Sequence, residues 1–169
     1  MELNKTLQDA LNTHINAEFN SAYLYLSMSA YCESIDMPGF AHWFHVQYRE
    51  ETSHALKLFD FVNDRGGRVA LLPIDQPPAD FRSPLDMLQR TLDHERKVTS
   101  MIHRLYEQAV EESDYPAQVL LQWFISEQVE EEKAAAEILE HLKLVGDDGA
   151  GLLMIDARLS ERGSDESRE

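Results

Sequence analysis

Four acidic residues lie near the midpoints of four long helical segments of this 169-residue chain, and each lies on the stripe that should face a core. They are Glu18, Glu51, Glu95 and Glu131. Burying even one ionised carboxylate costs several kcal/mol or more, so a core does not accept four of them without compensation. A cation is therefore expected between them, and the chain is a candidate for a metal-binding protein.

The composition is that of one soluble globular domain, with 43% apolar and 27% charged residues. The single cysteine, Cys32, rules out an internal disulfide framework and favours a reducing compartment, so we expect a cytoplasmic protein. The N-terminal residues show no signal peptide, and no apolar run is long enough to span a membrane. The formal net charge of -16 disfavours nucleic acid and anionic lipid as partners.

Apolar periodicity predicts an all-α chain with four long helices and a short fifth helix at the C-terminal end. The expected ranges are about 5–32, 38–65, 84–113, 115–145 and 152–162. Gly66-Gly67 and Gly146 should end the second and fourth helices, and Ser83 is the expected N-cap of the third. We expect residues 1–162 to form one domain and residues 163–169 to be a polar, flexible tail.

The connections between these helices decide how they are arranged. The first and second helices are joined by a few residues, as are the third and fourth, so each pair should be antiparallel neighbours. The stretch between Gly66 and Ser83 spans up to about 55–60 Å when extended, whereas a helix of this size is only about 40 Å long. A four-helix bundle with one long crossover between helices two and three is therefore predicted. Two separate hairpins are the alternative, but neither hairpin alone would cover its apolar faces.

In such a bundle the acids should meet at one level, because the midpoints of helices of equal length coincide whichever way each helix runs. His54 follows Glu51 at i+3 on the same face, and Gln128 lies near Glu131 on its stripe. Four carboxylates balance two divalent ions, and oxygen donors with few imidazoles suit iron or manganese better than structural zinc. A single glutamate on an apolar stripe is more often a boundary residue that reaches solvent. Four coincident acids with a histidine are harder to explain in that way.

The motifs around these residues resemble the ferritin family, specifically the non-haem ferritins of prokaryotes. The matching motifs are Ala17-Glu18-Phe19 with Tyr25, Glu50-Glu51-Thr52-Ser53-His54, Asp93-His94-Glu95 and the stretch 123–132. The similarity runs over about residues 3–159, nearly the whole chain. It implies an iron-storage protein with a ferroxidase centre in each subunit, which oxidises Fe(II) with dioxygen or hydrogen peroxide. It also implies a hollow shell of twenty-four subunits.

The resemblance further implies which residues bind two iron ions. The first ion would be bound by Glu18, Glu51 and His54. The second would be bound by Glu51 as a bridge, together with Glu95 and Glu131. Many di-iron bundles carry a second E-x-x-H motif on the fourth helix, but this chain has no histidine there. The second ion would therefore have only oxygen donors from the protein and should bind less tightly.

Other residues are implied close to these two ions. Gln128 would lie beside the ligands, and Tyr25 would lie next to them. We interpret Tyr25 either as a source of an additional electron or as a core aromatic residue with a polar tip. A third iron position is implied at Glu50, Glu127 and Glu130, which lie at the edges of their helical stripes.

Two related classes are disfavoured by what the chain lacks. Bacterioferritins hold haem with a methionine directly after the glutamate of the second helix, whereas Thr52 stands here, so no haem is expected. A rubrerythrin carries a pair of C-x-x-C motifs, which one cysteine cannot supply. The other histidines, His14 and His94 among them, are not expected to bind metal.

The resemblance leaves alternatives open. The apolar segments 70–74 and 152–159 would be covered by contacts within the shell, but either segment could instead fold back on its own bundle. Two other functions are a metal-buffering cage without redox chemistry and a di-iron oxygenase acting on an organic substrate. The oxygenase needs a pocket beside the metals, where Phe44, Tyr48, Ile102 and Phe124 are expected to fill the space.

Overall fold

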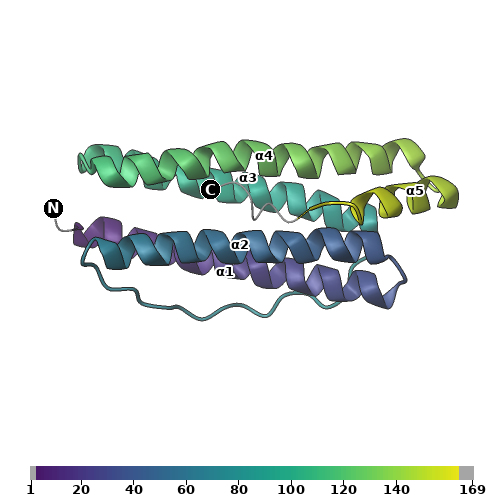
Figure 1. Ribbon diagram of the computed structural model, residues 1–169, viewed down its shortest axis with the longest axis horizontal. Helices are drawn as coiled ribbons and strands as arrows, with labels where there is room; N and C mark the ends of the chain where they lie inside the picture. Colours follow the sequence, from purple (N-terminus) through teal and green to yellow (C-terminus); the bar gives the residue numbers. More distant parts are fainter. Residues whose placement is uncertain (1–2, 164–169) are drawn as a thin grey trace.

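The computed structural model describes residues 3–163, and long α-helices lie side by side along its length (Figure 1). They are α1 (Lys5–Ser34), α2 (Pro38–Asp64), α3 (Pro84–Glu111) and α4 (Tyr115–Val145), followed by the short α5 (Gly149–Leu159). The predicted all-α bundle is confirmed. Of the predicted tail, residues 164–169 lie outside the described residues. Within residues 3–163, no helix has the length and apolar character needed to cross a membrane.

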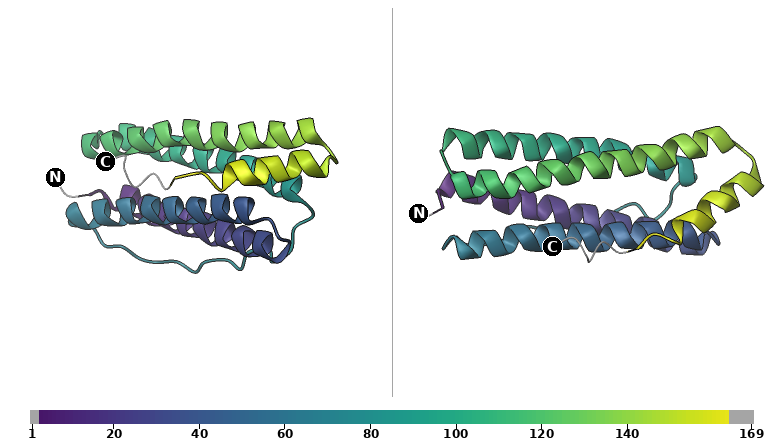
Figure 2. Two further views of the ribbon diagram at one scale, coloured as in Figure 1. Left: turned by 45° about the vertical axis from the view of Figure 1, so that its right-hand side comes forward. Right: turned by 45° about the horizontal axis from the view of Figure 1, so that its top comes forward.

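The connection between α2 and α3 runs outside the bundle along its whole length, so α2 and α3 point in the same direction (Figures 1 and 2). A row of amide side chains on α1, spaced by four residues, bonds to the backbone of this crossover: Asn12, Asn16 and Asn20. The donor–acceptor distances are 3.0, 2.9 and 2.8 Å. These bonds pair backbone groups that an extended chain leaves without partners. The predicted crossover is confirmed, and the alternative of two separate hairpins is wrong.

The helix ends follow local capping signals. The side chains of Asn4, Ser83 and Asp114 each accept a hydrogen bond from a backbone N–H group near the start of α1, α3 and α4. Such bonds satisfy donors that have no partner within the helix. α4 ends at Val145 and is followed by Gly146, whose positive φ of 53° glycine adopts without strain.

The short helix α5 is displaced from its predicted range of 152–162. Asp148 accepts hydrogen bonds from the backbone N–H groups of Ala150 and Gly151, so the helix begins earlier, at Gly149. It ends at Leu159, and Arg162 therefore lies beyond the helix rather than in its last turn. From the end of α4 the chain turns back alongside the bundle, where α5 contacts α2 and α4 (Figure 1).

A close contact between α5 and the start of α2 fixes this fold-back. The backbone N–H of Phe40 donates to Asp156 Oδ1 at 2.9 Å, so a buried carboxylate from α5 satisfies one of the first N–H groups of α2. Gly39 permits the approach, because an added Cβ there would lie 1.7 Å from the backbone oxygen of Asp156. Segment 152–159 thus packs in part on its own bundle, through Asp156 and Leu159. Leu153 and Met154 nevertheless remain 61% and 75% exposed.

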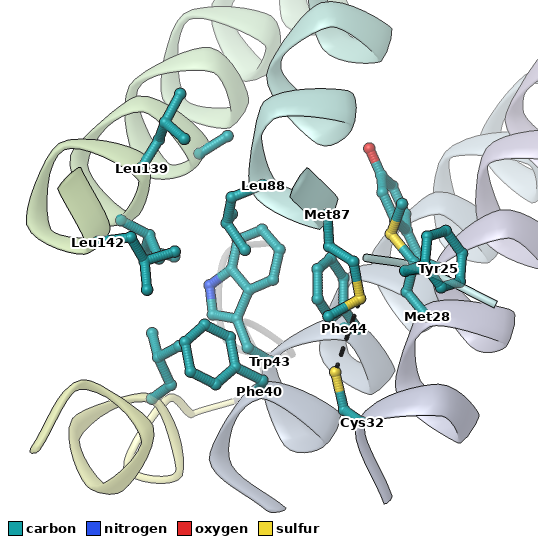
Figure 3. Packing of buried hydrophobic residues seen from close by; sticks show 14 of the residues in the cluster. Tyr25, Met28, Cys32, Phe40, Trp43, Phe44, Met87, Leu88, Leu139 and Leu142 are labelled. Atoms are coloured by element: carbon teal, nitrogen blue, oxygen red, sulfur yellow. Dashed lines mark hydrogen bonds between the residues drawn. The ribbon is translucent and has the colours of Figure 1, made fainter. Parts of the chain in front are cut away.

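In the described part of the chain, two hydrophobic clusters fill the bundle on either side of its middle. The cluster toward α5 contains Tyr25, Phe44 and Cys32 among others, and Figure 3 shows how they pack. Along α1, the other cluster extends as far as Ile15, and the cluster of Figure 3 begins at Tyr25. Glu18 lies between the two, so the level of the predicted acids is the level at which the apolar core is interrupted.

Candidate metal centre

The four predicted acids are all buried at the middle of the bundle, and each comes from a different helix. Glu18, Glu51, Glu95 and Glu131 are exposed by only 1, 2, 1 and 8%. His54 joins them from α2 and is 5% exposed. The expectation that these side chains face the core is therefore confirmed. Their role as ligands of a metal ion stays a prediction.

Three of these residues form a compact group of possible ligands. Among residues 3–163, Glu18, Glu51 and His54 each offer one ligand atom, and these atoms lie within 4.8 Å of one another. His54 Nδ1 is 3.7 Å from Glu51 Oε2 and 3.9 Å from Glu18 Oε2. These distances are too long for good hydrogen bonds. They suit donors around one ion, since ligands about 2.1 Å from a metal are separated from each other by roughly 3–4 Å.

Glu95 and Glu131 are held by neutral hydrogen-bond donors. Tyr25 donates its phenol hydrogen to Glu95, and Gln128 Nε2 donates to Glu95 Oε2 at 3.1 Å. Gln47 Nε2 donates to Glu131 Oε2 at 2.8 Å. Gln128 thus lies where it was predicted, beside the acids. Gln47 was not predicted, although it precedes Glu51 by one helical turn and therefore shares its face.

His14 is the second residue that the sequence analysis missed. It is 2% exposed, and its Nε2 lies 2.8 Å from Glu18 Oε1. Within the described part of the chain, His14 Nε2 and both carboxylate oxygens of Glu18 are buried without a well-aligned hydrogen-bond partner. Buried polar atoms of this kind are rare and costly, and a cation beside Glu18 would satisfy them. The i, i+4 spacing of His14 and Glu18 was the available signal.

The buried carboxyl groups differ in their pKa values. Burial raises the pKa of Glu51 well above its ordinary value, and the charges of Glu18 and Glu95 raise it further. Burial and the charge of Glu131 raise the pKa of Glu95 to about 8. Burial acts to raise the pKa of Glu18, but the contacts with His14 and Glu51 and the charge of His54 together outweigh it and lower that pKa to about 2. Without a cation, the centre therefore retains protons on some of its carboxyl groups at neutral pH.

Aromatic rings enclose the centre around Tyr25. The Tyr25 ring lies 6.2 Å from the ring of Phe44 and 6.0 Å from that of His94, measured between centroids. A ring nitrogen of His94 lies 2.7 Å from Ser21 Oγ. Burial lowers the pKa of His94 and raises the pKa of Tyr25, so both side chains are neutral at pH 7. The phenol therefore keeps the hydrogen that it donates to Glu95.

The residues predicted for a third iron position do not join the buried group of possible ligands. Glu50 and Glu127 are half-buried, Glu130 is exposed, and the group of possible ligands found in residues 3–163 includes none of them. Glu50 Oε2 accepts a hydrogen bond from Arg162 Nη2 at 2.7 Å. The approach of Arg162 was not predicted, because it depends on how α5 packs against α2.

Fold and centre together define a class of protein: a four-helix bundle whose core brings together glutamates and a histidine from several helices that could hold a metal ion. Residues 8–145 match the family model of the ferritin-like domain. The chain therefore belongs to the ferritin family, as its motifs indicated.

Similar proteins support this assignment over nearly the full chain. A probable bacterial non-haem ferritin-like protein of Haemophilus influenzae is 38% identical, over 93% of this chain and 95% of the relative. A bacterial non-haem ferritin of Staphylococcus saprophyticus is 37% identical, over 98% of this chain and 99% of the relative. The solved structure of an open-pore ferritin from Archaeoglobus fulgidus has a TM-score of 0.95 at 47% identity, covering 96% of this chain and 100% of that one.

The protein without bound metal should lose stability as the pH rises from about 5 to about 8. Because the pKa of Glu95 is raised from 4.5 to about 8, the folded state keeps a proton that the unfolded state has already released in this range. The free energy of unfolding should then fall by up to about 1.4 kcal/mol per pH unit for each such proton. Thermal unfolding in the presence of a chelator measures this dependence.

The substitution Glu95→Gln should flatten this pH dependence, since an amide does not titrate. Glu107→Gln, at an exposed position of the same helix, is the matched control and should leave it unchanged. A stability that increases with pH between about 5 and 8 in the unsubstituted protein would contradict the interpretation of the centre.

Proposed function

We propose that the protein oxidises Fe(II) at this centre and stores the product as a ferric mineral inside a hollow shell of its own subunits. The observation that carries the proposal is the buried group of Glu18, Glu51 and His54, in which both carboxylate oxygens of Glu18 lack a well-aligned hydrogen-bond partner that a cation would supply. Membership of the ferritin family supports iron as that cation. Hard carboxylate donors also stabilise Fe(III) relative to Fe(II), which favours oxidation at this site.

In this proposal two iron ions bind in each subunit, and Glu51 bridges them. The first ion is bound by Glu18, Glu51 and His54, and the second by Glu51, Glu95 and Glu131. The electrostatics of Glu51 support a bridging role, because the charges of Glu18, Glu95 and Glu131 all act to raise its pKa. Its carboxyl group thus interacts electrostatically with acids of both halves of the centre, and the proton that it holds would be released when a cation binds.

The chemistry needs two electrons from two Fe(II) ions. Dioxygen that accepts two electrons and two protons leaves as hydrogen peroxide, and peroxide that accepts two electrons and two protons leaves as water. Both oxidants are compatible with the proposal. Glu51 and Glu95 supply protons at the site as they become ligands. The bond from Tyr25 to Glu95 supports a role for the phenol in orienting this carboxylate, and a role in supplying an additional electron is the alternative.

Storage of a mineral needs a container larger than one bundle. The crossover leaves Leu71, Leu72 and Ile74 exposed by 68, 47 and 46%, and α5 exposes Leu153 and Met154. Neighbouring apolar side chains at the surface mark contacts with other proteins. They support assembly into a shell of twenty-four subunits, which completes the proposal together with a cytoplasmic location.

Substitution of a ligand of the first ion should slow iron oxidation by at least about tenfold, since removal of even an outer partner of a metal ligand costs that much. Glu18→Ala and His54→Ala are the variants, and the absorbance of Fe(III) after mixing Fe(II) with air-saturated buffer is the measurement. His103→Ala, an exposed histidine of α3, is the control and should react at the unsubstituted rate. Equal rates in all four proteins would eliminate catalysis and leave the metal-buffering cage.

The assembly is tested by native mass spectrometry of the purified protein. A particle of twenty-four copies of the 19.4 kDa subunit is expected, because both apolar segments are then covered. A stable monomer or dimer at micromolar concentration would remove storage from the proposal, whatever the rate of oxidation.

A further inference from the structure

Arg162, which lies beyond the end of α5, contacts three side chains of α2. Its Nη1 donates to Gln47 Oε1 at 2.6 Å, and its Nη2 donates to Glu50 Oε2 at 2.7 Å. The guanidinium carbon also lies 4.9 Å from the centroid of the Trp43 ring. Each arm of the planar guanidinium thus has its own acceptor, a geometry that the point charge of a lysine does not reproduce.

Gln47 extends this contact to Glu131. Its amide oxygen accepts from Arg162, and its Nε2 donates to Glu131 Oε2 at 2.8 Å. Gln47 is fully buried. Because a guanidinium only donates hydrogen bonds, it requires the amide oxygen on its own side, and this leaves the amide N–H group to face the carboxylate. Arg162 therefore selects the one amide orientation that is favourable to Glu131.

We propose that Arg162 is a positioning residue of the metal centre, which orients Glu131 through Gln47 and so strengthens binding of the second ion. This inference rests on the proposed function, in which Glu131 is a ligand of that ion. Gln47 donates to Oε2 of Glu131, which leaves Oε1 available to bind the ion. Without Arg162 the amide can rotate, and its oxygen would then repel the carboxylate. Hydrogen-bonded partners of a ligand typically change metal affinity 10–100-fold when removed.

The backbone around Arg162 is held by contacts that its side chain does not make. A ring nitrogen of His42 lies 2.7 Å from the backbone oxygen of Arg162, and the bond between Asp156 and Phe40 anchors α5 on α2. A substitution of the Arg162 side chain can therefore leave the segment in place. We call the contacts from Arg162 through Gln47 to Glu131 the relay. An effect of the substitution on the relay can therefore be distinguished from an effect on packing.

Titration with Co(II) tests the inference, because this ion does not undergo the oxidation and its visible absorption reports each ion bound. The unsubstituted protein is expected to bind two Co(II) ions per subunit, with the weaker constant belonging to the position without histidine. Arg162→Gln should weaken that second constant about tenfold and leave the first unchanged. Arg158→Gln removes an exposed positive charge from the last turn of α5, close to Arg162 in the sequence, and should change neither constant.

A double-substitution cycle distinguishes the relay from two independent effects. Gln47→Leu should cause the same loss as Arg162→Gln, and the combined variant should lose no more, because both substitutions break one chain of contacts. Unchanged affinity for the second ion in Arg162→Gln would overturn the inference, as would losses that add in the combined variant. Thermal unfolding midpoints close to that of the unsubstituted protein confirm that each variant is folded. If the unsubstituted protein does not bind two ions, the proposed function fails rather than the relay.

Discussion

Mutual repulsion among four buried carboxyl groups is the constraint on which the rest of this structure depends. Hydrophobic clusters on both sides of the acidic level hold the helices together and keep water from the centre. The acids cannot all be ionised there unless a cation accompanies them. Burial and neighbouring charges raise the pKa values of Glu51 and Glu95, whereas contacts with His14, Glu51 and His54 lower the pKa of Glu18. In the proposed function the centre exchanges protons for cations, as a site that repeatedly loads and releases iron requires.

Most of the architecture could be predicted because it depends on local patterns. Apolar periodicity and capping residues located the four long helices, and the length of the proline-rich stretch fixed the crossover. The convergence of Glu18, Glu51, Glu95 and Glu131 followed from their positions at helix midpoints. His14 and Gln47 were missed although each lies one helical turn before a predicted ligand. A search for polar residues at i−4 from each acid would have found both.

The contact of Arg162 could not be predicted, because it depends on tertiary packing. The fifth helix was predicted to extend to about residue 162, so Arg162 was expected to be part of its last turn. Asp148 caps the start of the helix at Gly149, the helix ends at Leu159, and the chain beyond it turns toward α2. Gly39 then allows the close approach that brings the guanidinium to Gln47. The third iron position was likewise inferred without knowledge that Glu50 pairs with this arginine.

The central claim is that ions are shared among the four acids. Anomalous diffraction from crystals soaked in Fe(II) without oxygen tests it most directly. The account predicts two iron peaks at the middle of each bundle, with Glu51 bound to both and His54 bound to one. Carboxylates that point away from any peak, or peaks that appear only on the outer surface, would contradict it.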